Sequence, residues 1–509
     1  MKYRSPVLLR MKRIFLGAIA LCAIAIFSSG VLHAQALDPG VITPTGTASP
    51  CGSGQPNPLP GLTTGEVNFF CAALARFEKV DSVSGVILPG TSGQCTPVDQ
   101  GHNASGSTIP CSETGVGLGP RFNGNSCAQC HAFPVVLAAS PVINPEVALA
   151  TLDGATNTVP SFLSKEGPIR EVRFINVPGT TTPDGNVHNL FTIKGRVDAT
   201  NAMNINGTTT TCLLQQPNFT PASNLIFRIP LQTLGDGLIE LIGDDNLENN
   251  HEMLTPSMGV SGFFNVSGND ATFTRFGWKA QNKSLLIFSA EAYNVEQGVT
   301  NEGFPNHREI DNELLGEDIN NCLFTALPED TTNITRLTPN TASASSDFSS
   351  DVTNFAAAMR FSAPPARQTS SFTAASLSNG QAVFDRIGCN LCHSDNSTGQ
   401  LVTVDQTTHP SNQGNKKVFP FSDLAVHDMG VGLQDQVTQG LADGRHFRSA
   451  PLWGLGSRIF LLHDGRTQGL VAAIEDHQSD NSEANTVISN FLMLSSSDQQ
   501  DLLNFLRSL

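Results

Sequence analysis

The chain has 509 residues, 39% of them hydrophobic and 15% charged, which is enough apolar content to bury a large core. Its 29 Lys and Arg residues are outnumbered by 45 Asp and Glu residues, so the net charge is −16 at pH 7. Nucleic acid binding needs a basic face, and we expect no nucleic acid partner for a chain this acidic. Composition therefore predicts a globular protein of two or more domains.

The first residues have the three-part layout of a secretory signal. Basic residues at positions 2, 4, 10, 12 and 13 precede an apolar run at 14–27, and small residues then lead to Ala36. We predict a signal peptide at residues 1–36, whose cleavage removes five basic residues and takes the net charge from −16 to −21. No later stretch reaches the ~18 apolar residues of a membrane span, so we expect an exported, periplasmic protein without stable membrane insertion.

Residues 37–64 are rich in Pro, Gly, Ser and Thr and lack apolar periodicity, which predicts an extended lead-in. In residues 65–83, by contrast, Val67, Phe70, Leu74 and Phe77 fall on one side of a helix. We therefore expect the first helix there.

Two Cys-x-x-Cys-His motifs follow: Cys127, Cys130 and His131, then Cys389, Cys392 and His393. Two cysteines at this spacing can each add to one vinyl group of a haem, and the next residue then ligates the iron. A zinc site normally offers a second Cys or His pair at short range, which both motifs lack, and a redox dithiol does not need the trailing His. The motifs predict two covalently bound haem c groups with His131 and His393 as proximal iron ligands.

The segment between the motifs changes character along its length. Residues 141–241 consist of short β-branched runs broken by Gly, Pro and Asn, whereas residues 283–294 and 346–359 have helical patterns. We place the main domain boundary near Pro364-Pro365.

Beyond this boundary, residues 378–388 predict a short helix that runs into the second motif. At the C-terminus, Ser496 and Gln499 have the spacing of a capping box, and Leu502, Phe505 and Leu506 follow at helical spacing. A helix before the motif and a helix that closes the domain are typical of a class I cytochrome c.

The predicted fold is mainly α, with two cytochrome c-like haem domains and irregular, β-rich insertions in the N-terminal part. We assign residues 65–363 to an N-terminal haem domain and residues 364–509 to a C-terminal cytochrome c domain.

Six cysteines remain outside the signal and the motifs: Cys51, Cys71, Cys95, Cys111, Cys212 and Cys322. An even remainder in an exported chain predicts disulfides, although sequence does not choose among the pairings. Proximity in the chain favours Cys95–Cys111.

Several segments carry a family resemblance: Phe421–Gly430, Phe447–Leu455, His463–Arg466, Gly117–Asn123 and Arg275–Ala280. In these the chain resembles the di-haem oxidoreductase family, whose members are described as peroxidases and are sometimes labelled thiol oxidoreductases. The family is more distantly similar to bacterial di-haem cytochrome c peroxidases and to the di-haem enzyme that matures methylamine dehydrogenase.

The resemblance implies a second axial ligand for the C-terminal haem. In the relatives this ligand lies on the helix after the His-Asp-Gly turn, which in this chain points to His477. Met429 is the rival, because a thioether would also ligate the iron. The residue types alone do not distinguish between an iron ligand and a surface residue for His477.

The relatives also place a Trp between the haems and a Glu and a Gln over the catalytic one. Trp278 matches the Trp and Glu296 the Glu, whose carboxylate would take a proton from peroxide and return it to the leaving oxygen. Phe288 occupies the Gln position, which is a departure from the peroxidase pattern. Without the resemblance, a core Trp and a solvated Glu are the simpler readings.

For the first haem the sequence offers no placed second ligand. Downstream candidates are His188, His251, Met253 and Met258, and an open position at this iron would make it the catalytic centre.

The leading hypothesis is a di-haem oxidoreductase of peroxidase type, in which the C-terminal haem passes electrons to the N-terminal one. Its partners would be a small cytochrome or cupredoxin and a small oxidant such as peroxide. The alternative is a non-catalytic electron-transfer cytochrome. The resemblance also implies a calcium ion between the domains, near Ser449–Pro451.

Overall fold

The computed structural model describes residues 36–43, 48–83, 94–95, 109–110, 116–200, 212–254, 256–308, 322–332, 349–395 and 417–509. Residues 1–35 of the predicted signal peptide lie outside these ranges. Within the ranges, no helix has both the length and the apolar content needed to cross a membrane.

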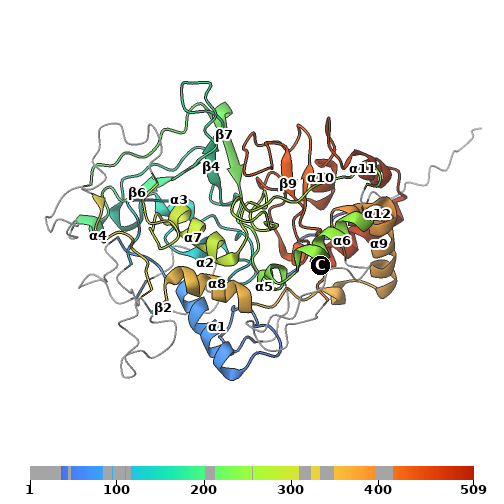
Figure 1. Ribbon diagram of the computed structural model, residues 1–509, viewed down its shortest axis with the longest axis horizontal. Helices are drawn as coiled ribbons and strands as arrows, with labels where there is room; N and C mark the ends of the chain where they lie inside the picture. The colour runs from blue at the N-terminus through green and yellow to red at the C-terminus, as the bar shows by residue number, and fades with distance from the viewer. Residues whose placement is uncertain are drawn as a thin grey trace, which may run out of the picture. The chain divides into compact units, whose positions relative to one another are not determined.

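Helices and short two- to four-residue strands alternate along the chain (Figure 1). The α-helices are α1 Thr64–Phe77, α2 Cys127–Cys130, α3 Glu146–Leu149, α4 Val197–Thr200, α5 Asp236–Glu240, α6 Asp244–Leu254, α7 Leu285–Glu296, α8 Asp351–Phe361, α9 Ala374–Ile387, α10 Leu470–Glu475, α11 Asn485–Leu492 and α12 Ser496–Ser508. The strands are β1 Gln94–Cys95, β2 Ile109–Pro110, β3 Arg121–Phe122, β4 Glu171–Phe174, β5 Val187–His188, β6 Phe191–Thr192, β7 Leu225–Arg228, β8 Val426–Asp428 and β9 His446–Arg448. The described part is thus rich in helix and contains small sheets, which confirms the helix-rich part of the predicted fold class.

Helix α1 begins with a capping box, in which the Thr63 hydroxyl accepts from the Glu66 N–H and the Glu66 carboxylate accepts from the Thr63 N–H. Phe70, Leu74 and Phe77 are buried on one face, which confirms the predicted helix. This face packs against α8, and the two helices lie side by side in Figure 1.

The other predicted helices are present with shifted ends. Residues 283–294 correspond to α7, residues 378–388 to α9, and residues 349–359 to α8. The remaining part of the third predicted helix, residues 346–348, lies outside the described residues.

A three-stranded antiparallel sheet, in the order β5-β4-β7, lies in the region predicted to be rich in short strands. Its register pairs Glu171 on β4 with Arg228 on β7. Direct cross-strand partners and residues two apart share a face of a sheet, so Glu171, Arg173 and Arg228 point the same way. This register sets the charges of the N-terminal cavity described below.

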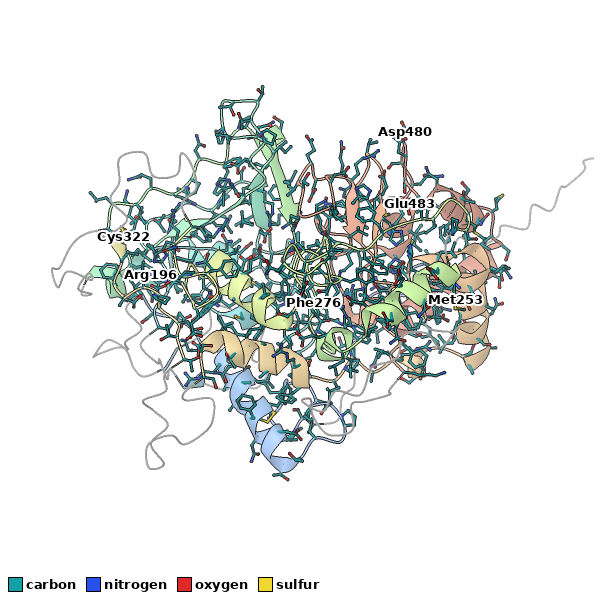
Figure 2. The ribbon with its side chains drawn as sticks, viewed as in Figure 1. Arg196, Met253, Phe276, Cys322, Asp480 and Glu483 are labelled. Atoms are coloured by element: carbon teal, nitrogen blue, oxygen red, sulfur yellow. A yellow bond between two sulfur atoms is a disulfide. The ribbon has the colours of Figure 1, made fainter. Side chains whose placement is uncertain are left out.

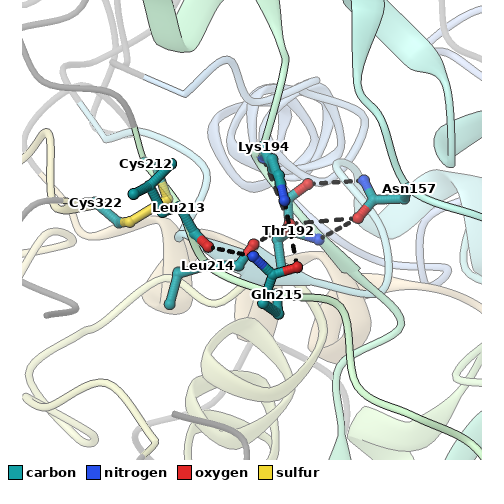
Figure 3. The surroundings of a disulfide bond; sticks show 8 residues. All are labelled: Asn157, Thr192, Lys194, Cys212, Leu213, Leu214, Gln215 and Cys322. Atoms are coloured by element: carbon teal, nitrogen blue, oxygen red, sulfur yellow. Dashed lines mark hydrogen bonds between the residues drawn. A yellow bond between two sulfur atoms is a disulfide. The ribbon is translucent and has the colours of Figure 1, made fainter. Parts of the chain in front are cut away.

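Among the described residues two disulfides are formed, Cys51–Cys71 and Cys212–Cys322. They confirm the predicted pairing for four of the six remaining cysteines. Figure 3 shows Cys212–Cys322 beside a polar network in which the Asn157 amide donates to the Thr192 carbonyl at 2.8 Å. The predicted Cys95–Cys111 pair stays a prediction, because Cys111 lies outside the described residues.

The C-terminal part is built on the crossing of α9 and α12, which are in extensive contact. Apolar side chains of both helices are buried in one cluster, including Val383, Phe384, Leu502 and Phe505. The predicted cap of α12 was wrong by one residue: Ser495, not Ser496, is the N-cap, and its hydroxyl accepts from the Asp498 N–H at 3.1 Å. The domain boundary near residue 364 stays a prediction.

The predicted lead-in is fixed to this C-terminal part. Arg507, which is buried, donates to both carboxylate oxygens of Asp38 at 2.7 and 2.8 Å, and the Leu470 N–H donates to Asp38 Oδ2 at 2.7 Å. A bidentate, charge-assisted contact of this kind holds the lead-in against α12.

Gly380 permits the close crossing of α9 and α12, and we predict that Gly380→Ala destabilises the protein. A Cβ at this position would lie 2.1 Å from the Asp501 carbonyl oxygen and 2.6 Å from Phe505 Cβ, so the free energy of unfolding should fall by about 1–3 kcal/mol. Gly268→Ala is the control, because its Cβ would meet no atom within 4 Å. Denaturant unfolding measures both. A Gly380→Ala variant as stable as the wild type would contradict the crossing.

Candidate functional site

The first motif forms α2, a single helical turn that follows a buried loop. Cys127, Cys130 and His131 all line a cavity of about 170 Å³, and the Gln297 amide donates to Cys127 Sγ at 3.2 Å. Neither Cys127 nor Cys130 forms a disulfide. The three side chains that the motif supplies are therefore gathered at one cavity wall.

The orientation of His131 suits a metal ligand. Its Nδ1 lies 3.3 Å from the Ala138 carbonyl oxygen. A carbonyl only accepts, so Nδ1 carries the proton and Nε2 keeps its lone pair. Burial lowers the pKa of His131 to about 4, which keeps the ring neutral.

The second motif repeats this arrangement in another cavity. Cys389 and Cys392 flank a 3₁₀ turn, and with His393 they line a cavity of about 240 Å³. His393 Nδ1 lies 3.2 Å from the Phe421 carbonyl oxygen, and burial lowers the pKa of His393 to about 4. Its Nε2 is thus also unprotonated.

A third imidazole, His477, lines the same C-terminal cavity just after α10. Its Nδ1 lies 2.7 Å from the Ala473 carbonyl oxygen, and burial lowers its pKa. Met429, the rival ligand, lines this cavity too. The structure brings both candidates to the right cavity, and the choice between them stays a prediction.

The residues around both cavities fit a haem. Each cavity offers two thiols, the imidazole of its motif histidine and an apolar wall, to which Phe77 and Phe355 contribute in the first and Phe384 and Phe491 in the second. The described residues contain no group of three or more His, Cys, Asp and Glu side chains that would hold a metal ion. This donor set favours haem over the zinc alternative.

Trp278 lines both cavities, together with Ile229, Pro230 and Leu231. Its indole Nε1 donates to the Ile229 carbonyl oxygen at 2.9 Å, which fixes the ring. Trp278 thus lies at the wall of both cavities, and its position between two haems and its role in electron transfer stay predictions.

Glu296 is the last residue of α7 and lines the N-terminal cavity. The Asn123 amide donates to Glu296 Oε2 at 2.8 Å. Burial, followed by the Glu171 carboxylate, raises the pKa of Glu296 to about 8. Phe288 lines the same cavity and stacks on Phe276, so an apolar ring is present where the relatives have an amide.

Sequence reasoning missed five charged residues at this cavity: Glu146, Glu171, Arg173, Arg228 and Glu291. For Glu171, Arg173 and Arg228, the only sequence signal was an ionisable residue within a short strand that is otherwise apolar. Arg228 also donates to Asp435 Oδ2 at 2.6 Å, and Asp435 accepts from the buried Lys279 at 3.0 Å.

The four candidate ligands for the first haem do not line its cavity in the described part of the chain. His188 contacts Asp184 at 3.0 Å, and His251 packs on Phe264. Met253 is exposed on α6 (Figure 2), and Met258 lies beside Gly388, in the second motif's neighbourhood. No side-chain imidazole other than His131 reaches this cavity among the described residues.

A second missed cluster borders the C-terminal cavity. His427 Nδ1 lies 3.0 Å from Glu483 Oε2, and Nε2 lies 3.1 Å from Asp423 Oδ2. Because both ring nitrogens face carboxylates, both carry protons and the ring is an imidazolium. Glu483, which is labelled in Figure 2, precedes α11 and also accepts from the Ser261 and Gly262 N–H groups.

Near Ser449–Pro451, where calcium was expected, the oxygens have protein partners. The Ser449 carbonyl accepts from the Ser422 hydroxyl at 2.6 Å, and the Pro451 carbonyl accepts from Arg458 at 2.6 Å. This geometry lends calcium no support, and the ion stays an untested expectation.

Residues 181–509 match the family model described as "Di-haem oxidoreductase, putative peroxidase". Among curated proteins no sequence matches the chain. The solved hydrazine synthase of Kuenenia stuttgartiensis aligns at 17% identity and a TM-score of 0.20, over 31% of this chain and 55% of that one; the chain thus spans about half of its length. A MauG-like protein associated with microbial copper homeostasis aligns at 12% identity and a TM-score of 0.25, over 55% of this chain and 91% of that one. Scores this low carry no argument about this chain.

The buried Glu146 gives a pH-dependent prediction. Burial raises its pKa from 4.5 to about 8, so the folded state holds a proton that the unfolded state loses between these values. Its contribution to stability is therefore lost as pH rises from 4.5 to 8. Relative to the wild type, Glu146→Gln should be more stable at pH 8 than at pH 5, by a difference on the order of a few kcal/mol. Denaturant unfolding at both pH values checks this, and equal differences at both would contradict a neutral Glu146.

Proposed function

Because the chain belongs to the di-haem oxidoreductase family, we propose that it is an exported di-haem c-type cytochrome with peroxidase-type activity. Electrons enter at the C-terminal haem and pass to a catalytic N-terminal haem. Attachment through the four motif cysteines, export to the periplasm and the direction of electron flow are all parts of this proposal.

One observation carries the proposal: the two cavities differ in the ionisable side chains that line them beside the motif histidine. Besides His393, the C-terminal cavity is lined by the imidazoles of His427, His463 and His477 and by one carboxylate, Glu483. Among the described residues the N-terminal cavity has no imidazole besides His131 and is lined instead by the carboxyl groups of Glu146, Glu171, Glu291 and Glu296. An iron with two strong protein ligands has no position for substrate. Carboxyl groups beside an open iron instead suit proton transfer to a small oxidant.

A haem bound at each motif supplies redox-active iron, and at the N-terminal cavity an iron position for peroxide. The chain's own residues bind and orient: His131 and His393 present Nε2, and Asn123 holds Glu296 at the cavity wall. Glu296 moves protons between the two peroxide oxygens, and Trp278, lining both cavities, lies on the route for electrons.

The overall reaction balances with a reduced donor protein. Hydrogen peroxide, two protons and two electrons give two water molecules, and a small cytochrome or cupredoxin delivers the electrons. The acidic chain, at −16 overall, suits a donor with a basic docking face.

We predict that His477→Ala removes the low-spin signal of the C-terminal haem from the electron paramagnetic resonance spectrum, because the iron loses an imidazole. Met429→Ala is the matched control, since Met429 lines the same cavity, and it should leave that signal unchanged. Haem content is measured in parallel. The opposite pattern, with only Met429→Ala affecting the signal, would assign the ligand to Met429.

We predict that Glu296→Gln lowers kcat/KM for peroxide reduction by about 10²–10⁴-fold, the usual contribution of a general acid–base group. Glutamine retains the size and the acceptor for Asn123 but holds no transferable proton. Glu329→Gln is the control, because Glu329 is a half-buried carboxyl that accepts from Thr300 and Thr325 and does not line the cavity. Wild-type activity in Glu296→Gln would exclude this role, and no peroxide turnover in the wild type would favour the electron-transfer cytochrome.

A further inference from the structure

Glu171 and Glu296 reach the N-terminal cavity from different elements, the start of β4 and the end of α7. Both side chains line this cavity, and the Glu171 carboxylate acts on Glu296 electrostatically. Two carboxylates that share one site repel each other, and a single shared proton removes the repulsion. At most one of the two is therefore ionised near neutral pH.

The arginines decide which carboxyl keeps the charge. Arg173 contacts Glu171 Oε1 through both Nε and a terminal nitrogen at 2.8 Å, and Arg228 is the cross-strand partner of Glu171. Arg228 is itself held by Asp435 at 2.6 Å and by the Gln439 side chain at 2.6 Å. Two cations fixed on one sheet face thus hold Glu171 in its ionised form.

Glu296 has a different environment. The neutral Asn123 amide donates to its side chain at 2.8 Å, and Arg308 and the ionised Glu171 act on it electrostatically. Burial opposes the ionisation of Glu171, but Arg173 and Arg228 hold its pKa below the usual range, whereas burial and Glu171 raise the pKa of Glu296 to about 8. The cavity has two further carboxyl groups: Glu146 accepts from Asn144 and the Arg170 N–H, and Glu291 accepts from the Asn282 amide.

We propose that Glu171 and Glu296 form a carboxyl pair that shares one proton, in which Glu171 is a positioning residue that keeps Glu296 protonated at the N-terminal cavity. This inference rests on the proposed function for its role in turnover. The pair can accept a proton because one member is ionised and donate one because the other is neutral, so acid and base are present at the same pH.

The test is an infrared titration of the haem-loaded protein at rest, without peroxide. The carboxylic acid C=O band of Glu296 is identified as the band that Glu296→Gln removes. It should be present at pH 6 and vanish around pH 8 in the wild type. In Glu171→Gln the like charge is gone, so the band should vanish at a pH lower by about one unit or more.

Glu329→Gln is the matched control: it removes its own band and leaves the Glu296 titration unchanged. If Glu171→Gln binds no haem, Glu171→Asp replaces it, and a shorter carboxylate should shift the titration in the same direction. An ionised Glu296 at pH 6 in the wild type would overturn the pair. A Glu296 titration that is the same with and without the Glu171 carboxylate would overturn the role of Glu171.

These outcomes are separate from those of the proposed function. A protein with the expected infrared titration but no peroxide turnover keeps the carboxyl pair and loses the peroxidase assignment. Peroxide turnover in a protein whose resting Glu296 is ionised keeps the peroxidase assignment and loses the carboxyl pair.

Discussion

Three half-buried imidazoles, each with its Nδ1–H directed at a backbone carbonyl, are the constraint on which the rest of the structure depends. Ala138, Phe421 and Ala473 provide these carbonyls to His131, His393 and His477 at 3.3, 3.2 and 2.7 Å. The contact fixes both the tautomer and the ring direction, so a neutral Nε2 faces the cavity in each case. His393 and His477 share one cavity, which His427 and His463 also line, whereas His131 is the only described histidine at the other. This unequal division underlies the proposed division of labour between carrier and catalyst.

The surroundings of the N-terminal cavity extend that asymmetry into charge. The β4–β7 register places acidic and basic side chains on one face, and Asp435 connects Arg228 to the buried Lys279. Such a network costs desolvation energy unless every charge is paired. Its placement beside a cavity is consistent with a site that transfers protons. Trp278 lines both this cavity and the C-terminal one.

Local patterns predicted much of this, because helical periodicity and the two haem motifs are properties of short segments. Helices α1 and α9 appear where apolar spacing indicated them, but the cap of α12 moved to Ser495 because three consecutive serines give the same signal and only the fold selects one hydroxyl. Glu171 was invisible to sequence reasoning, since its importance comes from pairing with Arg228, 57 positions away, and from its electrostatic effect on Glu296. His427 entered the sequence analysis only as part of the segment Phe421–Gly430, because its partner Glu483 lies 56 positions away along the chain.

The most direct test of the account is the electron paramagnetic resonance spectrum of the oxidised wild-type protein, with the haem content determined as the pyridine haemochrome. The account predicts two haems per chain, one low-spin and one high-spin, with the high-spin signal shifted by cyanide. Two low-spin signals that cyanide leaves unchanged would contradict an open catalytic iron at His131.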